Sequence, residues 1–175
     1  PGNRCVCYSE SIEYHLVEVT EVAEDSLAKP GDRLIVAGKM MAGVASESGI
    51  AAWKTLREGI DGAVLAGTVC AHPLRDAGYE FAVPLIPSGH VTTEAGSGFV
   101  HTAPGHGAED YDAVMAYNSQ VEQAGEGAAI EVPQTVSGDG TFFEHVPVFA
   151  GQHVYKADEP VAGALQEAGG LLARG

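Results

Sequence analysis

The chain has 175 residues, 45% of them hydrophobic and 19% charged, so it is long enough for one domain with a core and too apolar to be disordered. Its formal net charge of −15 argues against a general nucleic-acid surface, which needs lysine and arginine, yet still permits a pocket for one single-stranded end. No apolar run approaches the roughly 18 residues of a membrane span, and no secretory signal pattern is present.

In the first third of the chain, strands are predicted at 4–8 and 14–19, which are rich in valine, tyrosine and cysteine, and at 34–37, which is a short apolar run. Apolar residues spaced by three and four predict a helix over 39–47 and a second short helix over 50–58.

The middle and last thirds alternate further strands with two helices. Strands are predicted at 64–71, 80–86, 99–100, 146–149 and 153–155. Pro84 places its strand at a sheet edge or in a bulge. Helices are predicted from Ala108 through Val121 and from Asp158 to a stop at Gly169. The pattern indicates a β-rich α+β fold.

Cysteine usage indicates the compartment. The three cysteines make no even disulfide framework and no Cys-x-x-Cys pair. We expect reduced, mostly buried thiols in a cytoplasmic protein. Because neither end carries a closing element, we expect a domain excised from a larger chain.

The stretch 96–111 concentrates the chemistry. Its prolines and glycines predict a loop between a short strand and the start of a helix. His101, His106, Glu109 and Asp110 lie on or beside this loop, and such loops often carry functional groups because a rigid scaffold positions them.

Asp110 and His101 are the candidates for a site. A carboxylate in the first helical turn is favoured by the helix dipole, so Asp110 is either a group that binds an ammonium ion or a helix-capping acid. Glu109 points roughly 100° away around the helix and is expected to face solvent. His101 can be a base, a hydrogen-bond donor, a steric wall or a structural residue, and His106 is either exposed or folded over a pocket.

Other kinds of site fit less well. The spacing of the histidines and acids matches no zinc pattern, so no metal site is predicted. The glycine-rich stretch lacks the Gly-Lys-Ser/Thr ending of a phosphate loop and the Rossmann spacing.

The run His-Thr-Ala-Pro-Gly-His-Gly-x-Glu-Asp-Tyr at 101–111 resembles the signature of the editing (connective-peptide) domain inserted in bacterial isoleucyl-tRNA synthetase. Nearly the whole chain is similar to that family, and the further matches lie at 1–4, 70–73, 90–98, 138–140 and 154–157. The sister valyl enzymes usually carry lysine at the position of His101.

The resemblance implies a single editing domain over 1–175, with the class I synthetase editing fold: a β-barrel-like core and peripheral helices. It implies hydrolysis of the ester of mischarged valyl-tRNA(Ile), and of valyl-adenylate as a further candidate substrate. The implied partners are the 3′ end of aminoacylated tRNA, the valine moiety and the rest of the synthetase chain, without a membrane. No cofactor is expected in this domain, because ATP and magnesium belong to the synthetic site elsewhere in such enzymes.

The resemblance also implies roles for residues. Asp110 would hold the substrate ammonium, and His101 would line the side-chain pocket and reject isoleucine or position the terminal ribose. Thr102, His106 and Tyr111 would shape the pocket. Water would attack the ester with help from a hydroxyl of the terminal adenosine.

Two alternatives stay open: a non-catalytic aminoacyl-RNA binding module, and a metal-dependent hydrolase using His101, His106 and the acids. The threonine-rich run that the family carries just before the segment equivalent to 1–4 is not in this sequence. We therefore expect the isolated chain to hydrolyse weakly.

Overall fold

The computed structural model describes residues 1–174, so Gly175 of the predicted domain lies outside the described residues. These residues form two compact units. The first contains residues 1–6, 67–86 and 101–164, and the second contains 7–66, 87–100 and the chain from Leu165 on. The single editing domain expected from the sequence stays a prediction.

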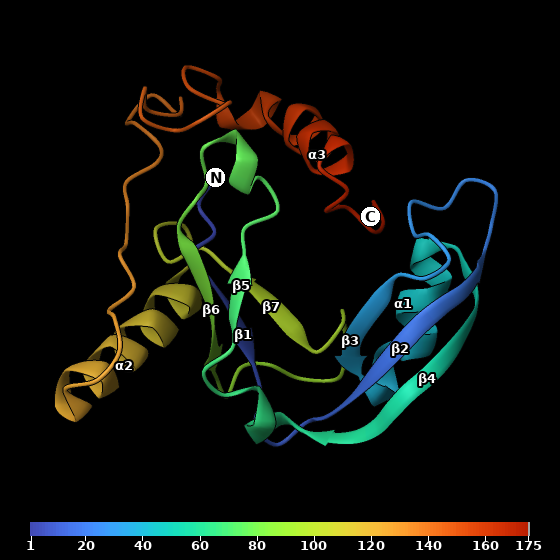
Figure 1. Cartoon of the computed structure of the whole chain (residues 1–175). Helices are drawn as coiled ribbons and strands as arrows, with labels where there is room; N and C mark the ends of the chain where they lie inside the picture. Colours follow the sequence, from blue (N-terminus) through green and yellow to red (C-terminus); the bar gives the residue numbers. More distant parts are fainter. Residues whose placement is uncertain (175) are drawn as a thin grey trace. The chain divides into compact units, whose positions relative to one another are not determined.

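The strands and α-helices, labelled as in Figure 1, are β1 (Cys5–Tyr8), β2 (Glu13–Val22), β3 (Arg33–Ala37), α1 (Met41–Ser48), β4 (Ile50–Asp61), β5 (Val69–Ala71), β6 (Ala82–Pro87), β7 (Phe99–Thr102), α2 (Ala108–Ala124) and α3 (Asp158–Glu167). Short 3-10 turns occupy η1 (Gly38–Met40), η2 (Gly62–Leu65), η3 (Arg75–Ala77) and η4 (Val154–Lys156).

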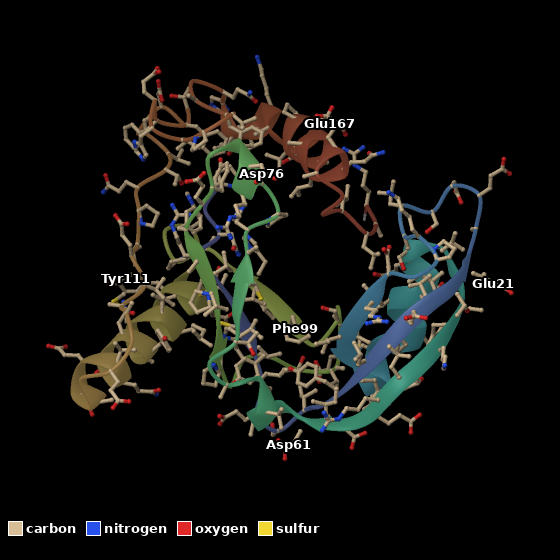
Figure 2. All side chains as sticks on the ribbon, viewed as in Figure 1. Glu21, Asp61, Asp76, Phe99, Tyr111 and Glu167 are labelled. Atoms are coloured by element: carbon tan, nitrogen blue, oxygen red, sulfur yellow. The ribbon has the colours of Figure 1, made fainter. Side chains whose placement is uncertain are left out.

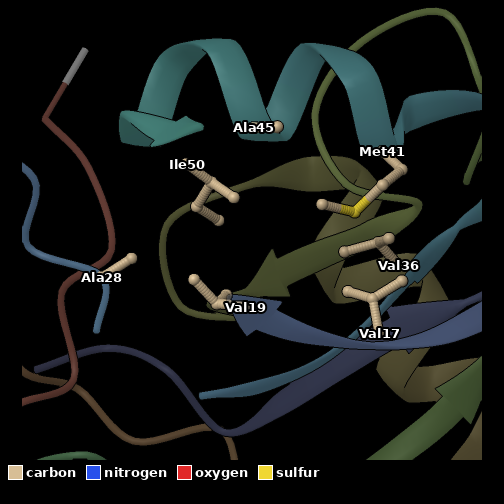
Figure 3. Packing of buried hydrophobic residues seen from close by; sticks show 7 residues of the cluster. All are labelled: Val17, Val19, Ala28, Val36, Met41, Ala45 and Ile50. Carbon is tan, nitrogen blue, oxygen red and sulfur yellow. The ribbon is translucent and has the colours of Figure 1, made fainter. Parts of the chain in front are cut away.

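The second unit is built on an antiparallel sheet with the order β3-β2-β4. Alternating residues of β2 face inward, because successive side chains of a strand point to opposite faces. Helix α1 lies over this inner face, as Figure 3 shows. The resulting core consists of Val17, Val19, Ala28, Val36, Met41, Ala45 and Ile50.

The pairing of β2 with β4 is irregular along its length. The register shifts between Tyr14 and Leu16, between Leu16 and Val17, and twice more between Val19 and Val22. Each shift breaks the ladder locally and increases the twist of the strand. The long strand β4, at the edge of this sheet, is therefore bent.

The helix predicted over 50–58 is wrong, because these residues form most of β4. The apolar spacing of Ile50, Trp53 and Leu56 fits one helix face, yet pairing with β2 determines the conformation. Trp53 and Leu56 remain 37% and 38% exposed, so their spacing does not mark a buried helix face.

The four-stranded sheet has the order β5-β6-β1-β7 and lies mainly in the first unit. Cys5 and Cys7 of β1 are buried, and Cys70 of β5 is half-buried. The α+β class is confirmed. In residues 1–174 the two sheets do not close into a barrel, so the barrel-like core expected from the resemblance is not confirmed.

Three local predictions need correction. Pro84 is not on an edge strand, because β6 lies between β5 and β1; it pairs with Val69 of the short strand β5. The strands expected at 146–149 and 153–155 are instead turns and the 3-10 turn η4. There, contacts such as the bond from the Phe142 amide to the Gln152 carbonyl replace a continuous ladder.

The two long helices match their predictions closely. α2 begins at Ala108 and ends before Gly125, whose φ of 67° is the left-handed conformation that glycine adopts most easily. α3 begins at Asp158, and Gly169 follows it with a φ of 69°. None of the helices in residues 1–174 combines the length and apolar character that spanning a bilayer requires.

Candidate functional site

The loop between β7 and α2 carries the predicted site residues. β7 ends at Thr102, Ala103 and Pro104 are buried beneath the loop, and α2 starts at Ala108. A turn in the loop is closed by the amide of His106, which donates to the carbonyl of Ala103 at 2.9 Å. The strand–loop–helix order expected from the prolines and glycines is confirmed.

Asp110 folds back over this loop. Its Oδ2 accepts a hydrogen bond from the backbone amide of Ala103 at 2.8 Å. The carboxylate can lie there because Gly107 has no side chain: a Cβ at that position would come within 3.2 Å of Oδ2. The carboxylate thus fastens the helix start to the strand end, and it does not cap an amide of its own helix.

Asp110 is half-buried, and its carboxylate is held in place by the bond from Ala103 to Oδ2. A carboxylate oriented in this way suits a cationic group such as a primary ammonium, because a charge-assisted bond is stronger than a neutral one.

His101 lies close enough to Asp110 for their charges to interact. Its side chain reaches solvent, yet desolvation by the surrounding chain lowers the pKa of His101. The charge of Asp110 raises the pKa of His101 in opposition, as a smaller effect. The net effect favours the neutral form of the imidazole.

His106 and Tyr111 line a pocket of about 610 Å³. The ring of His106 is fixed by a 2.7 Å hydrogen bond between its Nε2 and the hydroxyl of Thr135, which is buried. Tyr111, labelled in Figure 2, is 46% exposed at the start of α2. Aspartate, glutamate, lysine and arginine are absent from the twelve described residues that line this pocket.

The predicted residues therefore fall into three places. Asp110 and His101 are neighbours, His106 and Tyr111 share the pocket, and Thr102 is fully buried at the end of β7. Glu109 is exposed, as expected. Their functional roles stay predictions.

Two features of the surroundings were missed from the sequence. The pocket wall from Val132 to Gly138 comes from a segment without regular periodicity, and no motif marks it. The second feature is an aromatic cluster: His72 stacks on Tyr79 with ring centroids 4.6 Å apart and meets the edge of Phe81 at 5.4 Å. The His72-Pro73 dipeptide drew attention to His72 in the sequence, but it did not predict its contacts with Tyr79 and Phe81.

The cluster holds His72 in a neutral state. Burial lowers the pKa of His72 to about 4, and the charges of Arg4 and His101 add to the effect. Its Nδ1 accepts a hydrogen bond from the amide of Leu74 at 3.0 Å, so the proton of the neutral ring is on Nε2. Burial also raises the pKa of Tyr79 to about 12, and its hydroxyl donates to the carbonyl of Pro147 at 2.8 Å.

Among residues 1–174, no group of three or more histidine, cysteine, aspartate or glutamate side chains is arranged to hold a metal ion. The candidate site is thus described by one carboxylate, histidine side chains and backbone amides. Such a set binds and orients a ligand through hydrogen bonds and charge.

Comparison with known proteins gives close relatives over the whole chain. The isoleucine–tRNA ligase of Bradyrhizobium diazoefficiens is 44% identical over 184 residues, which cover 100% of this chain and 18% of the ligase. The isoleucine–tRNA ligase of Caulobacter vibrioides is 42% identical over 192 residues, with the same coverage. The chain thus spans about a fifth of the length of these relatives. No protein-family model matches the chain.

A solved structure shares the fold. The crystal structure of GlLeuRS-CP1, the connective-peptide domain of a LeuRS, matches with a TM-score of 0.58 at 16% identity, covering 98% of this chain and 62% of that one. The resemblance noted in the sequence is therefore confirmed: the chain is homologous over its whole length to a segment of isoleucine–tRNA ligases.

Proposed function

We propose that this chain, a segment homologous to isoleucine–tRNA ligases, is their proofreading domain and hydrolyses the ester of valyl-tRNA(Ile). The whole-length homology and the connective-peptide fold support a proofreading role in general. The observation that carries the proposal is the carboxylate of Asp110, with Oδ2 fixed on the amide of Ala103 and with His101 close enough for their charges to interact.

The need for such a domain is physical. Valine lacks one methylene of isoleucine, and one methylene in a hydrophobic pocket contributes only roughly 1–3 kcal/mol of discrimination, a limit for which isoleucyl-tRNA synthetase is itself the established example. A second site that admits valine and excludes isoleucine removes the errors that remain.

In this proposal Asp110 binds the α-ammonium of the valyl group. Oδ1 accepts from the ammonium while Oδ2 keeps its bond to Ala103, so the carboxylate is oriented before the substrate arrives. The neutral ring of His101 forms a wall of the side-chain pocket without repelling the ammonium, and the extra methylene of isoleucine collides with it.

The pocket bordered by His106 and Tyr111 takes the terminal nucleoside. Its volume of about 610 Å³ lies in the range of small-molecule sites, and Tyr111 offers an exposed ring for stacking. Because acidic side chains are absent from its described lining, the pocket does not repel a phosphodiester, although the chain as a whole carries a net charge of −15.

The reaction is the addition of water to the ester carbonyl. The bond between the carbonyl carbon and the ribose oxygen then breaks, one water proton passes to that oxygen, and valine leaves as the carboxylate with release of the other proton. The neighbouring ribose hydroxyl relays the proton, because the residues around Asp110 supply positioning rather than a strong base. No cofactor takes part in this scheme.

The test is deacylation of valyl-tRNA(Ile) and isoleucyl-tRNA(Ile) by a full-length ligase that contains this segment. Valine release that stops when the segment is deleted, with isoleucyl-tRNA left intact, supports the proposal. Tight binding of valyl-tRNA without release of valine would identify a binding module instead. Release that stops with a chelator and returns with added metal would identify a metal-dependent hydrolase.

A further inference from the structure

Arg4 holds the segment that precedes β1 in a defined shape. Its Nη1 donates to the carbonyl of Asn3 at 2.7 Å and to the carbonyl of Pro1 at 3.2 Å. Its guanidinium carbon lies 4.2 Å from the centre of the Phe81 ring, and its backbone amide donates to Thr102 at 3.0 Å. The side chain of Arg4 therefore joins residues 1–3 to the aromatic cluster, while its backbone amide ties the same residue to the end of β7.

The segment held by Arg4 lies against the candidate site. Gly2 packs on the ring of His106 so closely that a Cβ on Gly2 would be 2.7 Å from its Cδ2. Asn3 is buried and donates to the carbonyl of Cys5 at 2.9 Å. Residues 1–3 thus form a wall against the ring of His106 and the side chain of Ala103.

We propose that Arg4 is a positioning residue of the proofreading site: it fixes residues 1–3 as the wall against which His106 and the bound ester are held. The proposal rests on the proposed function. Arg4 touches no reacting atom in this scheme and acts through the segment that it clamps.

Arginine suits this role better than lysine. A planar guanidinium can stack on Phe81 and donate to two carbonyls at once, whereas an ammonium is a compact point charge without a flat face. Lysine at this position keeps the positive charge but loses the shape of the clamp. The substitution therefore separates positioning from charge.

The experiment measures kcat and KM for valyl-tRNA(Ile) deacylation by a full-length ligase that contains this segment. Arg4→Lys is expected to lower kcat about tenfold with KM within about twofold, because small misplacements of a site act on the reaction more than on binding. Gly2→Ala should reproduce the loss by pushing the same wall away from His106. Arg75→Lys, at an exposed arginine of η3, is the matched control and should leave both constants unchanged.

Phe81→Leu supplies an independent variant that leaves Arg4 in place. It removes the ring beneath the guanidinium and should lower kcat about threefold, and the double variant with Arg4→Lys should be no slower than Arg4→Lys alone, since both changes break one clamp. Proton NMR of the His106 ring should shift in each of these variants, whereas the melting temperature reports any loss of folding separately.

A folded Arg4→Lys enzyme with unchanged kcat and an unchanged His106 NMR signal overturns the proposal. If Arg4→Lys does not fold, a folded Phe81→Leu enzyme with full activity overturns it as well. If the unsubstituted ligase releases no valine from valyl-tRNA, the proposed function fails and the role of Arg4 with it. Valine release by the unsubstituted ligase but equal kcat in every variant refutes the clamp alone.

Discussion

Asp110→Asn is the substitution that separates the charge of the carboxylate from its shape. The asparagine oxygen can still accept from the amide of Ala103, the bond that measures 2.8 Å with Oδ2, so the loop keeps its anchor. What is lost is the interaction of Oδ1 with the substrate ammonium, since the amide NH₂ that replaces Oδ1 is a donor.

The size of the loss follows from this geometry. A hydrogen bond to a charged group contributes roughly 1.5–3 kcal/mol, and about 2 kcal/mol corresponds to roughly a 30-fold fall in kcat/KM. Asp110→Ala should cost at least as much, because it also leaves the amide of Ala103 without its acceptor. The assay is valine release from valyl-tRNA(Ile) by a full-length ligase carrying this segment, with stability followed by thermal melting.

Glu109→Gln is the matched control. It removes the same charge from the preceding residue of the same helix turn, but Glu109 is exposed. Its kcat/KM should stay within about twofold of the unsubstituted enzyme, because exposed charges away from the site act weakly. If Asp110→Asn keeps full activity, or if Glu109→Gln loses as much, a specific ammonium-binding role for Asp110 is refuted.

Three further predictions concern specificity and stability. His101→Ala should make the ligase release isoleucine from isoleucyl-tRNA(Ile); intact isoleucyl-tRNA in the deacylation assay would contradict a steric role. Because the pKa of His72 is lowered from 6.5 to about 4 on folding, the unfolded chain binds more protons in that range, and the free energy of unfolding should fall as pH drops from about 6.5 towards 4. His72→Asn, which keeps an acceptor for the amide of Leu74, should flatten this dependence in denaturant titrations, and an unchanged slope would assign it to other groups. Gly98→Ala should destabilise the chain by more than about 1 kcal/mol, because the new Cβ would lie 2.5 Å from the Cβ of Ala37 on a backbone with a φ of 83°. Gly96→Ala is the control, since Gly96 has a similar φ of 76° but open space around it, and so reports the backbone strain alone. Equal melting temperatures of the two variants would show that the clash with Ala37 contributes nothing.

The sequence predicted the elements whose signals are local. The prolines and glycines between β7 and α2 located the loop, the apolar spacing of α2 gave its extent, and Asp110 was placed correctly in the first turn. In such segments propensity, turn chemistry and periodicity agree, so short-range information suffices.

The failures came from long-range pairing. The segment 50–58 has helix-like apolar spacing, but β2 offers it a partner strand, and hydrogen bonding across the sheet outweighs the local preference. Likewise, no local signal connects Thr135 with His106, since 29 positions separate them and the bond depends on two loops meeting. The clamp of Arg4 on Phe81 is invisible in the sequence for the same reason.

The irregular pairing of β4 bears on how the protein behaves at high concentration. β4 lies at one end of the β3-β2-β4 order, where a straight, flat strand would offer free amides and carbonyls to a second molecule. The breaks in register bend this strand, and Lys54, Arg57 and Glu58 place charged side chains along it. Two copies that approached edge to edge would therefore match poorly in shape and would have to desolvate these charges, which disfavours fibrous assembly through this strand.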